Sequence, residues 1–303
     1  MSGKRTQSDW LLFALLSSLW ASAYALTREA VATLPTALIV PGRLGLGAII
    51  LILVCFLRGE TWPKLSDRKA WLTLAAMGLI GTVLPFTLIT EAQKTVDSSL
   101  AALYVSAAPI FVGISSHFLF AEERMTRSKA LGVFVGFIGV LVLFGPDAIA
   151  NFGSATVIAQ FLLLFATLMY ASSTLIARAA PEMSPLVFSA GFLSFGALFS
   201  LPLLADVEFA ALQPSTASII SVVALAVGPS AVASLLYPII VRRAGPTFLS
   251  LTGYVIPIIS SIIGFVLFRE VLGWNAYLAF ALILTGVYIS QRKPAKAKPL
   301  QAE

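Results

Sequence analysis

Few residues in this chain could carry out chemistry, and they stand apart from one another. The single cysteine, Cys55, lies in an apolar run, and there are no Cys/His clusters of the zinc-binding kind. Catalytic spacings such as His-Glu-x-x-His, Gly-x-Ser-x-Gly or paired membrane aspartates are also absent. The single histidine, His117, could relay protons. We interpret it as structural, because the apolar stretches offer it no carboxylate partner. We therefore predict no enzyme activity, no metal and no cofactor.

Polar and aromatic side chains near the centres of apolar stretches could instead hold a small molecule. A zwitterion needs hydrogen-bond partners for its ammonium and carboxylate groups and apolar walls for its side chain. Ser and Thr also pack between membrane helices, and Tyr and Trp also mark membrane interfaces, so each residue alone is ambiguous. As a set that lines one cavity, the substrate-binding candidates are Trp20, Tyr24, Thr82, Phe86, Tyr104, Tyr170, Ser173, Ser230, Tyr237 and Tyr254.

One arginine and two prolines stand out inside apolar stretches. Arg43 follows Pro41-Gly42, and we expect its side chain to snorkel to the external interface, with contact to a substrate carboxylate as the alternative. Pro109 and Pro257 each remove a backbone hydrogen bond and kink a helix. Because these two prolines recur at equivalent positions, we predict that they shape a cavity or supply a gating bend.

The composition of the chain indicates the environment in which these residues lie. Of its 303 residues, 58% are hydrophobic and only 11% are charged, and the mean hydropathy is +0.94. A soluble domain carries about 25% charged residues, so the composition excludes disordered, disulfide-stapled secreted and nucleic-acid-binding proteins. It predicts a polytopic membrane protein whose partners are the lipid bilayer and a small-molecule substrate, with no nucleic acid.

Apolar stretches long enough to cross a bilayer recur along the whole chain. A bilayer core about 30 Å thick needs roughly 20 apolar residues as helix, and continuous apolar runs favour helices over the alternating strands of a barrel. We predict ten spans, at 9–27, 35–57, 70–91, 96–120, 128–145, 155–178, 184–204, 215–240, 247–268 and 272–291.

Positive charges are distributed unevenly between alternate connections. Sixteen Lys and Arg residues fall on one side and three on the other, with Arg43 undecided. The positive-inside rule then places both termini in the cytoplasm. Lys4-Arg5 before an apolar run and Ala21-Ser22-Ala23 also resemble a cleaved secretory signal. We prefer an uncleaved first span, because cleavage would move the basic C-terminus outside.

The two halves of the chain repeat each other. When the stretch from Pro109 to Glu122 is placed over the stretch from Pro257 to Glu270, at a fixed spacing of 148, six of fourteen pairs are identical. A weaker echo pairs Trp20-Ala21-Ser22 with Tyr170-Ala171-Ser172. With five spans in each half, the second half must be inverted relative to the first. Such inverted repeats are typical of alternating-access transporters. We predict repeats at 1–150 and 151–303, the second with a short basic cytoplasmic tail.

Two glutamates end the repeated segment, one in each half. We interpret Glu122 and Glu270 as structural, each accepting hydrogen bonds from backbone N–H groups at the next helix start or pairing with Arg124 or Arg269. No Asp, Glu or Lys lies in the middle of a predicted span. Because ion-coupled pumps usually keep such a residue, we favour facilitated transport over ion coupling.

On these residues the chain resembles EamA-type members of the drug/metabolite transporter superfamily. The family pattern is two five-helix units with a Trp-small-small start, an early Arg in the second helix, a Pro and then Glu in the fourth, and a Gly-rich fifth helix. The matching residues are Trp20-Ala21-Ser22, Arg43, Pro109, Glu122, Gly132, Gly136 and Gly139 in the first unit, and Pro257, Glu270 and Gly286 in the second. The second unit departs from the pattern with Met169-Tyr170 in place of Trp and with no Arg in its second helix.

The resemblance implies a fold more specifically than a substrate. The chain is most similar to bacterial amino-acid exporters, including the YddG-like aromatic amino acid group, but Ala108 and Met169 stand where one such exporter has bulky aromatics, which favours a broader amino-acid range. We expect an all-α integral membrane exporter of amino acids, aromatic ones included, or of similar metabolites, present as a monomer or weak homodimer. Proton-coupled multidrug or metabolite efflux is the alternative, and an intramembrane enzyme is the alternative from a different class.

Overall fold

The computed structural model describes residues 6–119, 125–145, 151–205, 207–244, 246–249 and 251–291, and within these ranges it contains helices and turns but no strand. Eight helical segments are long and apolar enough to cross a membrane, and two further apolar helices, α13 (Thr252–Phe268) and α14 (Trp274–Gln291), are shorter. Helix occupies every predicted span, and the ends differ from the predicted limits by at most four residues. Hydropathy alone therefore located the elements.

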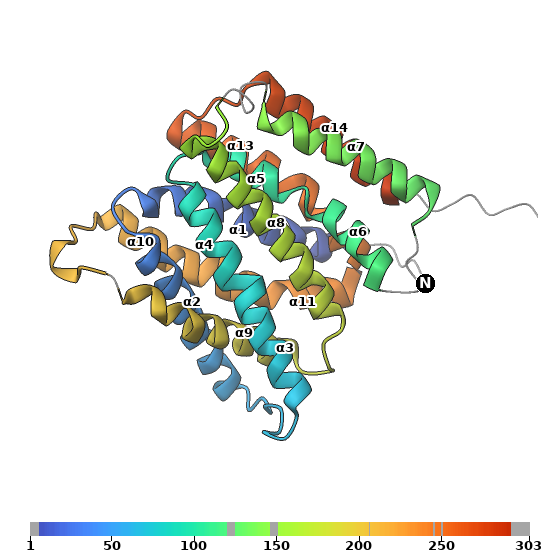
Figure 1. Ribbon diagram of the computed structural model, residues 1–303. Coiled ribbons are helices and arrows are strands. Elements are labelled where there is room, and N and C mark those ends of the chain that lie inside the picture. Colours follow the sequence, from blue (N-terminus) through green and yellow to red (C-terminus); the bar gives the residue numbers. More distant parts are fainter. Residues whose placement is uncertain are drawn as a thin grey trace, which may run out of the picture.

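The remaining helices follow in order along the chain (Figure 1). In the first half they are α1 (Gln7–Val31), α2 (Thr36–Leu57), α3 (Arg68–Gly78), a π-helical turn (Leu79–Val83), α4 (Leu84–Ala92), α5 (Ser98–Val105), α6 (Ala108–Leu119) and α7 (Arg127–Phe144). In the second half they are α8 (Ala155–Arg178), α9 (Pro185–Ser200), 3₁₀ turns at Leu201–Leu204 and Phe209–Ala211, α10 (Thr216–Leu225), a π-helical turn (Ala226–Val232), α11 (Ala233–Ala244) and α12 (Pro246–Leu249).

Polar residues at the edges of the apolar stretches fix where several helices begin. Thr6 and Asp9 form a reciprocal capping box at the start of α1. Asp67, Ser154 and Ser215 each accept a hydrogen bond from the backbone N–H three residues later. These side chains satisfy N–H groups that have no partner within the helix, so each apolar stretch starts its helix at a defined residue.

The fourth predicted span is broken rather than kinked. Helix α5 ends at Val105 and α6 begins at Ala108, which leaves Pro109 in the first turn of the new helix, where its missing N–H is not needed. The corresponding stretch of the second half is also divided, into α12 and α13, but at a different place, because the positions that match Ser106-Ala107 at the spacing of 148 fall inside α13, as Pro257 does. The predicted kink at Pro109 is therefore replaced by an interruption at Ser106-Ala107.

Two π-helical turns interrupt two long segments at corresponding places. One turn, Leu79–Val83, joins α3 to α4, and the other, Ala226–Val232, joins α10 to α11. Thr82 and Ser230 lie in these turns at the spacing of 148 that relates the halves in sequence. Because π-helical turns interrupt the regular hydrogen bonds of a helix and are frequent at functional sites, both turns are candidate binding positions.

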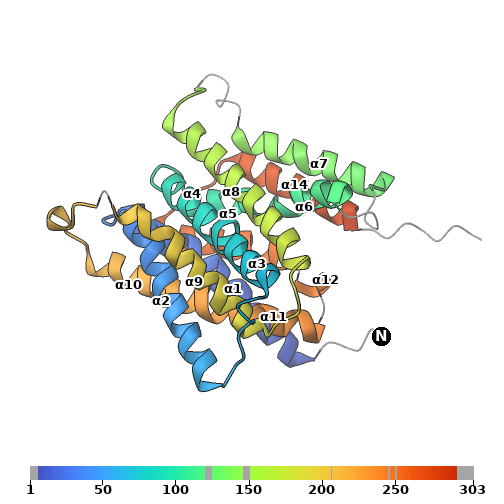
Figure 2. The ribbon, with the colours of Figure 1, turned by 60° about the horizontal axis from the view of Figure 1, so that its bottom comes forward.

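Helices of each half pack against helices of the other half. Helix α1 packs against α10, α11 and α13, while α8 packs against α4, α5 and α6. Helix α2 packs against α9, and α7 packs along α14. Figures 1 and 2 both show α7 and α14 side by side at one edge of the bundle. Each half thus buries its helices against their counterparts in the other half.

Glycines set the close approach of α7 and α14. A Cβ added at Gly286 would lie 2.5 Å from the backbone N of Gly136, and one added at Gly139 would lie 2.9 Å from the backbone N of Ile283. The predicted tight packing of Gly132, Gly136 and Gly139 is therefore observed, and it occurs within the chain.

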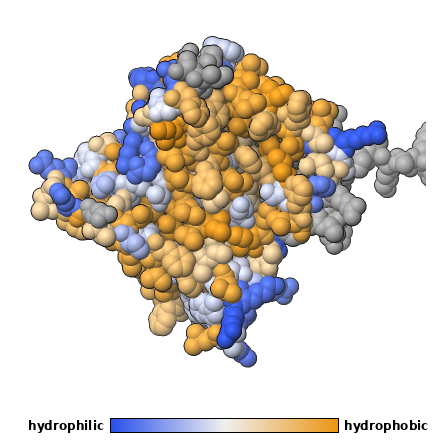
Figure 3. Space-filling view, in the orientation of Figure 1, coloured by the Kyte–Doolittle hydropathy of each residue, from blue (hydrophilic) through white to orange (hydrophobic). Residues whose placement is uncertain are grey.

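The outer surface is largely apolar. Phe56, Leu57 and Phe118 each expose more than two thirds of their side chains. In Figure 3 hydrophobic residues cover the centre of the face shown, and hydrophilic residues gather at its margins. An apolar face of this kind suits contact with lipid rather than water.

Candidate functional site

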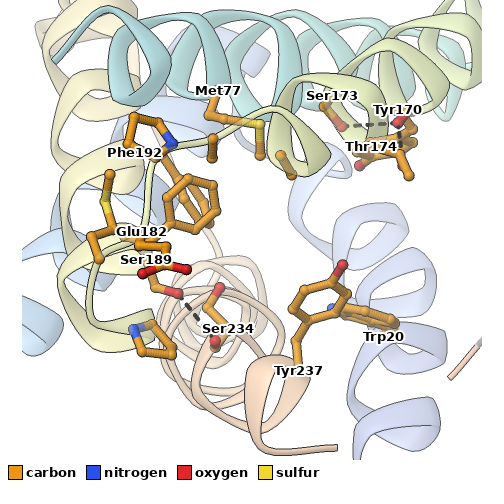
Figure 4. A pocket seen from close by; sticks show the side chains of 16 residues that line it. Trp20, Met77, Tyr170, Ser173, Thr174, Glu182, Ser189, Phe192, Ser234 and Tyr237 are labelled. Carbon is orange, nitrogen blue, oxygen red and sulfur yellow. Dashed lines mark hydrogen bonds between the residues drawn. The ribbon is translucent and has the colours of Figure 1, made fainter. Parts of the chain in front are cut away.

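A cavity of about 440 Å³ lies between helices from both halves of the chain (Figure 4). Its walls come from α1, α3, α8, α9 and α11 and from the connection between α8 and α9. Four of the predicted binding residues line it, namely Trp20, Tyr170, Ser173 and Tyr237. The cavity is large enough for a molecule of amino-acid size.

The lining of the cavity is aromatic and apolar, with a few hydroxyl groups. Trp20 and Tyr237, from α1 and α11, lie with ring centroids 6.1 Å apart. Ser173 Oγ donates to the carbonyl oxygen of Tyr170 at 2.9 Å, and Ser189 Oγ donates to that of Ser234 at 3.1 Å. Both hydroxyl oxygens keep lone pairs that can accept a hydrogen bond from an ammonium group.

The cavity lies toward one end of the molecule. Ala180, Pro181, Glu182 and Met183, from the connection that follows α8, line its mouth. The early part of α8 is at the opposite end, where Ala159 and Leu163 share a hydrophobic cluster with Val96 and Ala101. The cavity therefore opens at the end of the bundle where α8 stops and α9 begins.

A second group of predicted residues surrounds Arg43. The Arg43 side chain is only 9% exposed, its Nε donates to Ser230 Oγ at 2.8 Å, and its Cζ lies 3.7 Å from the centroid of the Phe86 ring. Tyr24 and Tyr170 lie close enough to interact with it electrostatically. The structure thus gathers four of the ten candidates around an arginine that the sequence did not place among them.

Arg43 does not reach the interface, in contrast to the expectation from its sequence position. Helix α2 begins at Thr36, so Arg43 lies about 10 Å inside the helix. The Phe86 ring and the Ser230 hydroxyl then hold the guanidinium against the neighbouring helices. Pro41, two residues before Arg43, also lies within the helix.

The remaining three candidates belong neither to the cavity lining nor to the group around Arg43. Tyr104 is fully buried in the core, with its ring 5.6 Å from that of Phe144 in an edge-on contact. Thr82 donates to the carbonyl oxygen of Gly78 within the first π-helical segment. Tyr254 packs beside the cluster formed by Ile110, Val140, Ile283 and Val287. These three residues contribute to packing in this conformation.

A charged cluster closes the end of the bundle opposite the cavity mouth. Both carboxylate oxygens of Glu270 accept hydrogen bonds from the first residues of α5, including the backbone N–H groups of Ser98 at 3.0 Å and Ser99 at 2.9 Å. Arg28, at the end of α1, lies 3.3 Å from Glu270 and 2.7 Å from Asp97. The cluster ties α1, α5 and the turn after α13 together.

The observed partners of Glu270 differ from the predicted ones. Glu270 accepts from backbone N–H groups at a helix start, but that helix is α5, more than 170 residues earlier in the chain, and its cation is Arg28 rather than Arg269. Burial alone would raise the pKa of Glu270, but the hydrogen bonds from Ser99 and Ser98 outweigh it and hold the pKa below its usual value. Glu122 lies outside the described residues.

His117 also has a structural contact. Its Nδ1 accepts a hydrogen bond from the backbone N–H of Met125 at 3.0 Å, which fastens the end of α6 to the chain just before α7. The observed contact agrees with the structural interpretation of this residue.

Comparison with known proteins identifies the family to which this architecture belongs. Residues 8–145 and 157–291 each match the EamA-like transporter family. The chain belongs to this family. As an EamA-type protein it is a membrane transporter, and the two matched segments coincide closely with the two halves described above.

Three relatives named as transporters or exporters match nearly the whole chain. The chain is 25% identical over 288 residues to an uncharacterized transporter from Archaeoglobus fulgidus, covering 94% of this chain and 99% of that protein. It is 25% identical to the uncharacterized inner membrane transporter YedA from Escherichia coli K12, covering 96% and 94%. It is 24% identical to a probable terminal-alkyne amino-acid exporter from Streptantibioticus cattleyicolor, covering 96% and 95%.

A solved structure shares the fold. One crystal structure of a protein superposes with a TM-score of 0.65 at 21% identity, covering 95% of this chain and 97% of that chain. At this level of identity the likeness supports the helical architecture and says nothing about the substrate.

Proposed function

We propose that this EamA-type transporter exports amino acids or similar small metabolites across the bacterial inner membrane by alternating access. The observation that carries the proposal is the cavity between the two halves, which opens at one end of the bundle, while a charged cluster joins the helices at the other end. A transporter needs a site of this kind, reachable from one side at a time.

The internal symmetry of the molecule supports the mechanism. The interrupted fourth stretch and the π-helical turn each occur once in each half, and α1 and α8 exchange equivalent contacts. In the proposed arrangement ten helices form two inverted five-helix repeats, at 1–150 and 151–303. The interruptions allow helix segments to tilt separately, so the same substrate site becomes accessible first from one side and then from the other.

Charge distribution supports the direction. The cavity mouth lies beside the end of α8 at Arg178, and this end belongs to the side that holds sixteen of the twenty Lys and Arg residues. By the positive-inside rule it faces the cytoplasm, together with both termini. The described conformation is then inward-facing, ready to accept a molecule for export.

The substrate class and energetics follow from the lining. Aromatic walls with serine hydroxyls and a nearby arginine suit a zwitterion with an apolar side chain. The relative from Streptantibioticus cattleyicolor, a probable amino-acid exporter, supports this class. Export is facilitated rather than ion-coupled, since no carboxylate or lysine of the described residues lies in the middle of a span.

Uptake of a panel of radiolabelled amino acids into proteoliposomes, with and without a pH gradient, tests the proposal. We expect saturable uptake that does not depend on the gradient. Ala177→Trp should abolish it by filling the cavity, whereas Ile220→Trp, at a side chain 60% exposed on the outer surface, should leave it unchanged. Accumulation driven by the gradient would instead favour proton coupling, and no uptake of any amino acid would contradict the substrate class.

A further inference from the structure

The guanidinium of Arg43 is buried without an acidic partner. Among the described residues no carboxylate lies within ion-pair distance of it, since the three ion pairs found involve Arg28 and Lys94 only. The Phe86 ring and the Ser230 hydroxyl provide a cation–π contact and one hydrogen bond. Neither neutralises the charge, and an unpaired cation inside a membrane span is costly and usually functional.

The guanidinium also keeps hydrogen-bonding capacity. Its Nε is used by Ser230, and no hydrogen bond from either terminal Nη group is found within the described residues. An arginine in this state offers two terminal amino groups to one oxyanion, in the planar geometry that matches a carboxylate. Tyr24 and Tyr170 pack in one hydrophobic cluster beside the cavity, which Tyr170 also lines, and their phenolic hydroxyls can donate to the same anion.

Arg43 lies one helical turn beyond the lining of the cavity. Its hydrogen-bond partner Ser230 precedes Ser234, which lines the cavity, by four residues on the segment that continues into α11. Tyr24 lies one helical turn beyond Trp20 on α1, on the same face and farther from the cavity mouth. A molecule that enters past Glu182 and fills the space beside Trp20 therefore has Arg43 ahead of it.

We propose that Arg43, with the hydroxyl groups of Tyr24 and Tyr170, binds the carboxylate of the transported molecule. The assignment rests on the proposed function and narrows its substrate to molecules with one carboxylate. The substrate's side chain lies between Trp20 and Tyr237, and the carboxylate completes the ion pair that Arg43 lacks. Binding the carboxylate releases the charge from its interhelical contacts with Phe86 and Ser230, which join α2 to the segments containing both π-helical turns.

The site occurs once in the molecule. At the spacing of 148 the position that corresponds to Arg43 is Gly191, which packs against Leu74 of α3 and carries no charge. A single guanidinium forms an ion pair with a single carboxylate. We therefore expect a monocarboxylate to be preferred over a dicarboxylate of the same length.

Competition assays with purified protein in proteoliposomes test the assignment. The probes are an amino acid that the wild type transports, its amide, which lacks the carboxylate charge, and its deaminated acid, which lacks the ammonium group. We expect the amide to compete at least 10-fold less well than the deaminated acid, because a hydrogen-bonded charge contributes a factor of about 10 to 100 in affinity.

Variants separate a binding role from a structural one. Arg43→Gln should reduce transport of the amino acid by about 10- to 100-fold and remove the preference for the acid over the amide. Arg43→Lys should retain that preference with weaker binding, since it keeps the charge and loses the planar fork. Arg58→Gln, at an exposed position at the end of the same helix, should change neither.

Three results would overturn the assignment. Equal competition by amide and acid in the wild type would show that the carboxylate is not bound as a charge. An Arg43→Gln variant that weakens both probes equally, or an Arg43→Lys variant that loses the preference, would show that Arg43 only supports the helices. If the wild type transports none of the probes, the proposed function itself fails, and this assignment fails with it.

Discussion

Glu270 provides the sharpest test of how the bundle is held together. Its side chain is 1% exposed, and its two oxygens accept hydrogen bonds from the backbone N–H and hydroxyl groups of Ser98 and Ser99. Replacing it with alanine removes the cap of α5 and leaves Arg28 with Asp97 alone. Every one of the contacts that Glu270 makes connects the second half of the chain to the first.

The expected loss of stability follows from the contacts. Loss of a helix cap costs about 1 kcal/mol, and each buried donor of Ser98 and Ser99 that is left without its acceptor costs about 1–3 kcal/mol. The two terms share the same carboxylate, so we expect about 3–5 kcal/mol in total for Glu270→Ala rather than their sum. Glu270→Gln should cost about half as much, because its amide oxygen can still accept while its NH₂ group faces donors.

Equilibrium unfolding of the purified protein in detergent micelles measures these differences. Glu91→Gln is the matched control, because Glu91 pairs with Lys94 on the surface at 2.7 Å and both side chains are about 40% exposed. Such an exposed pair contributes at most about 1 kcal/mol, so this variant should behave like the wild type.

The pH dependence gives a second readout of the same carboxylate. Hydrogen bonds hold the pKa of Glu270 in the folded protein below its ordinary value of about 4.3. The stabilisation is therefore complete above pH 4.3 and is lost as the pH falls through the lower folded-state pKa. The stability gap between wild type and Glu270→Gln should be constant from pH 7 to 5 and shrink in more acidic solution. A gap below about 0.5 kcal/mol at pH 7, or one that widens toward acid, would refute the reasoning.

Further substitutions test other contacts. Asp97→Asn should cost at most about 1 kcal/mol of stability in the same assay, since Asp97 is 43% exposed. Tyr104→Phe should leave stability unchanged or slightly higher, because no partner for the buried hydroxyl is found in the described part of the chain. Gly139→Leu should destabilise by more than 3 kcal/mol or prevent folding, because its side chain would collide with the backbone of α14 at Ile283; Leu141→Ala, at a 56% exposed position on the same helix, should have little effect.

The positions of the helices were predictable because they depend on features that are close together in the sequence. Hydropathy located each helical stretch because a bilayer requires continuous apolar runs, and caps such as Asp67 and Ser154 fixed helix starts through contacts three residues away. The interruption at Ser106-Ala107 was not predictable, since the apolar run continues through it. Proline indicated a disturbance there but not whether it would bend or divide the helix.

The candidate site was predictable only in part. The ten polar and aromatic candidates were chosen because they lie near span centres, a criterion that fixes depth in the membrane but not the face of the helix that they occupy. Trp20 and Tyr237 face the cavity, whereas Tyr104 at a similar depth faces the core. Arg43 was assigned to the interface because a lone cation in lipid is costly. Its neighbour Ser230, 187 residues away, becomes evident only when the helices are packed.

The features that recur in both halves of this molecule differ in kind from the feature that occurs in one half only. The features that recur in both halves, namely the interrupted helices and the π-helical turns, are backbone features that permit bending. The feature with no counterpart is Arg43, whose corresponding position is Gly191. In the proposed cycle the two halves exchange conformations, so the recurring features must be interchangeable. The substrate site must remain the same in both conformations, so its charge need be present only once. Moving an arginine to position 191 while removing Arg43 would therefore not restore transport, because Gly191 faces Leu74 rather than the cavity.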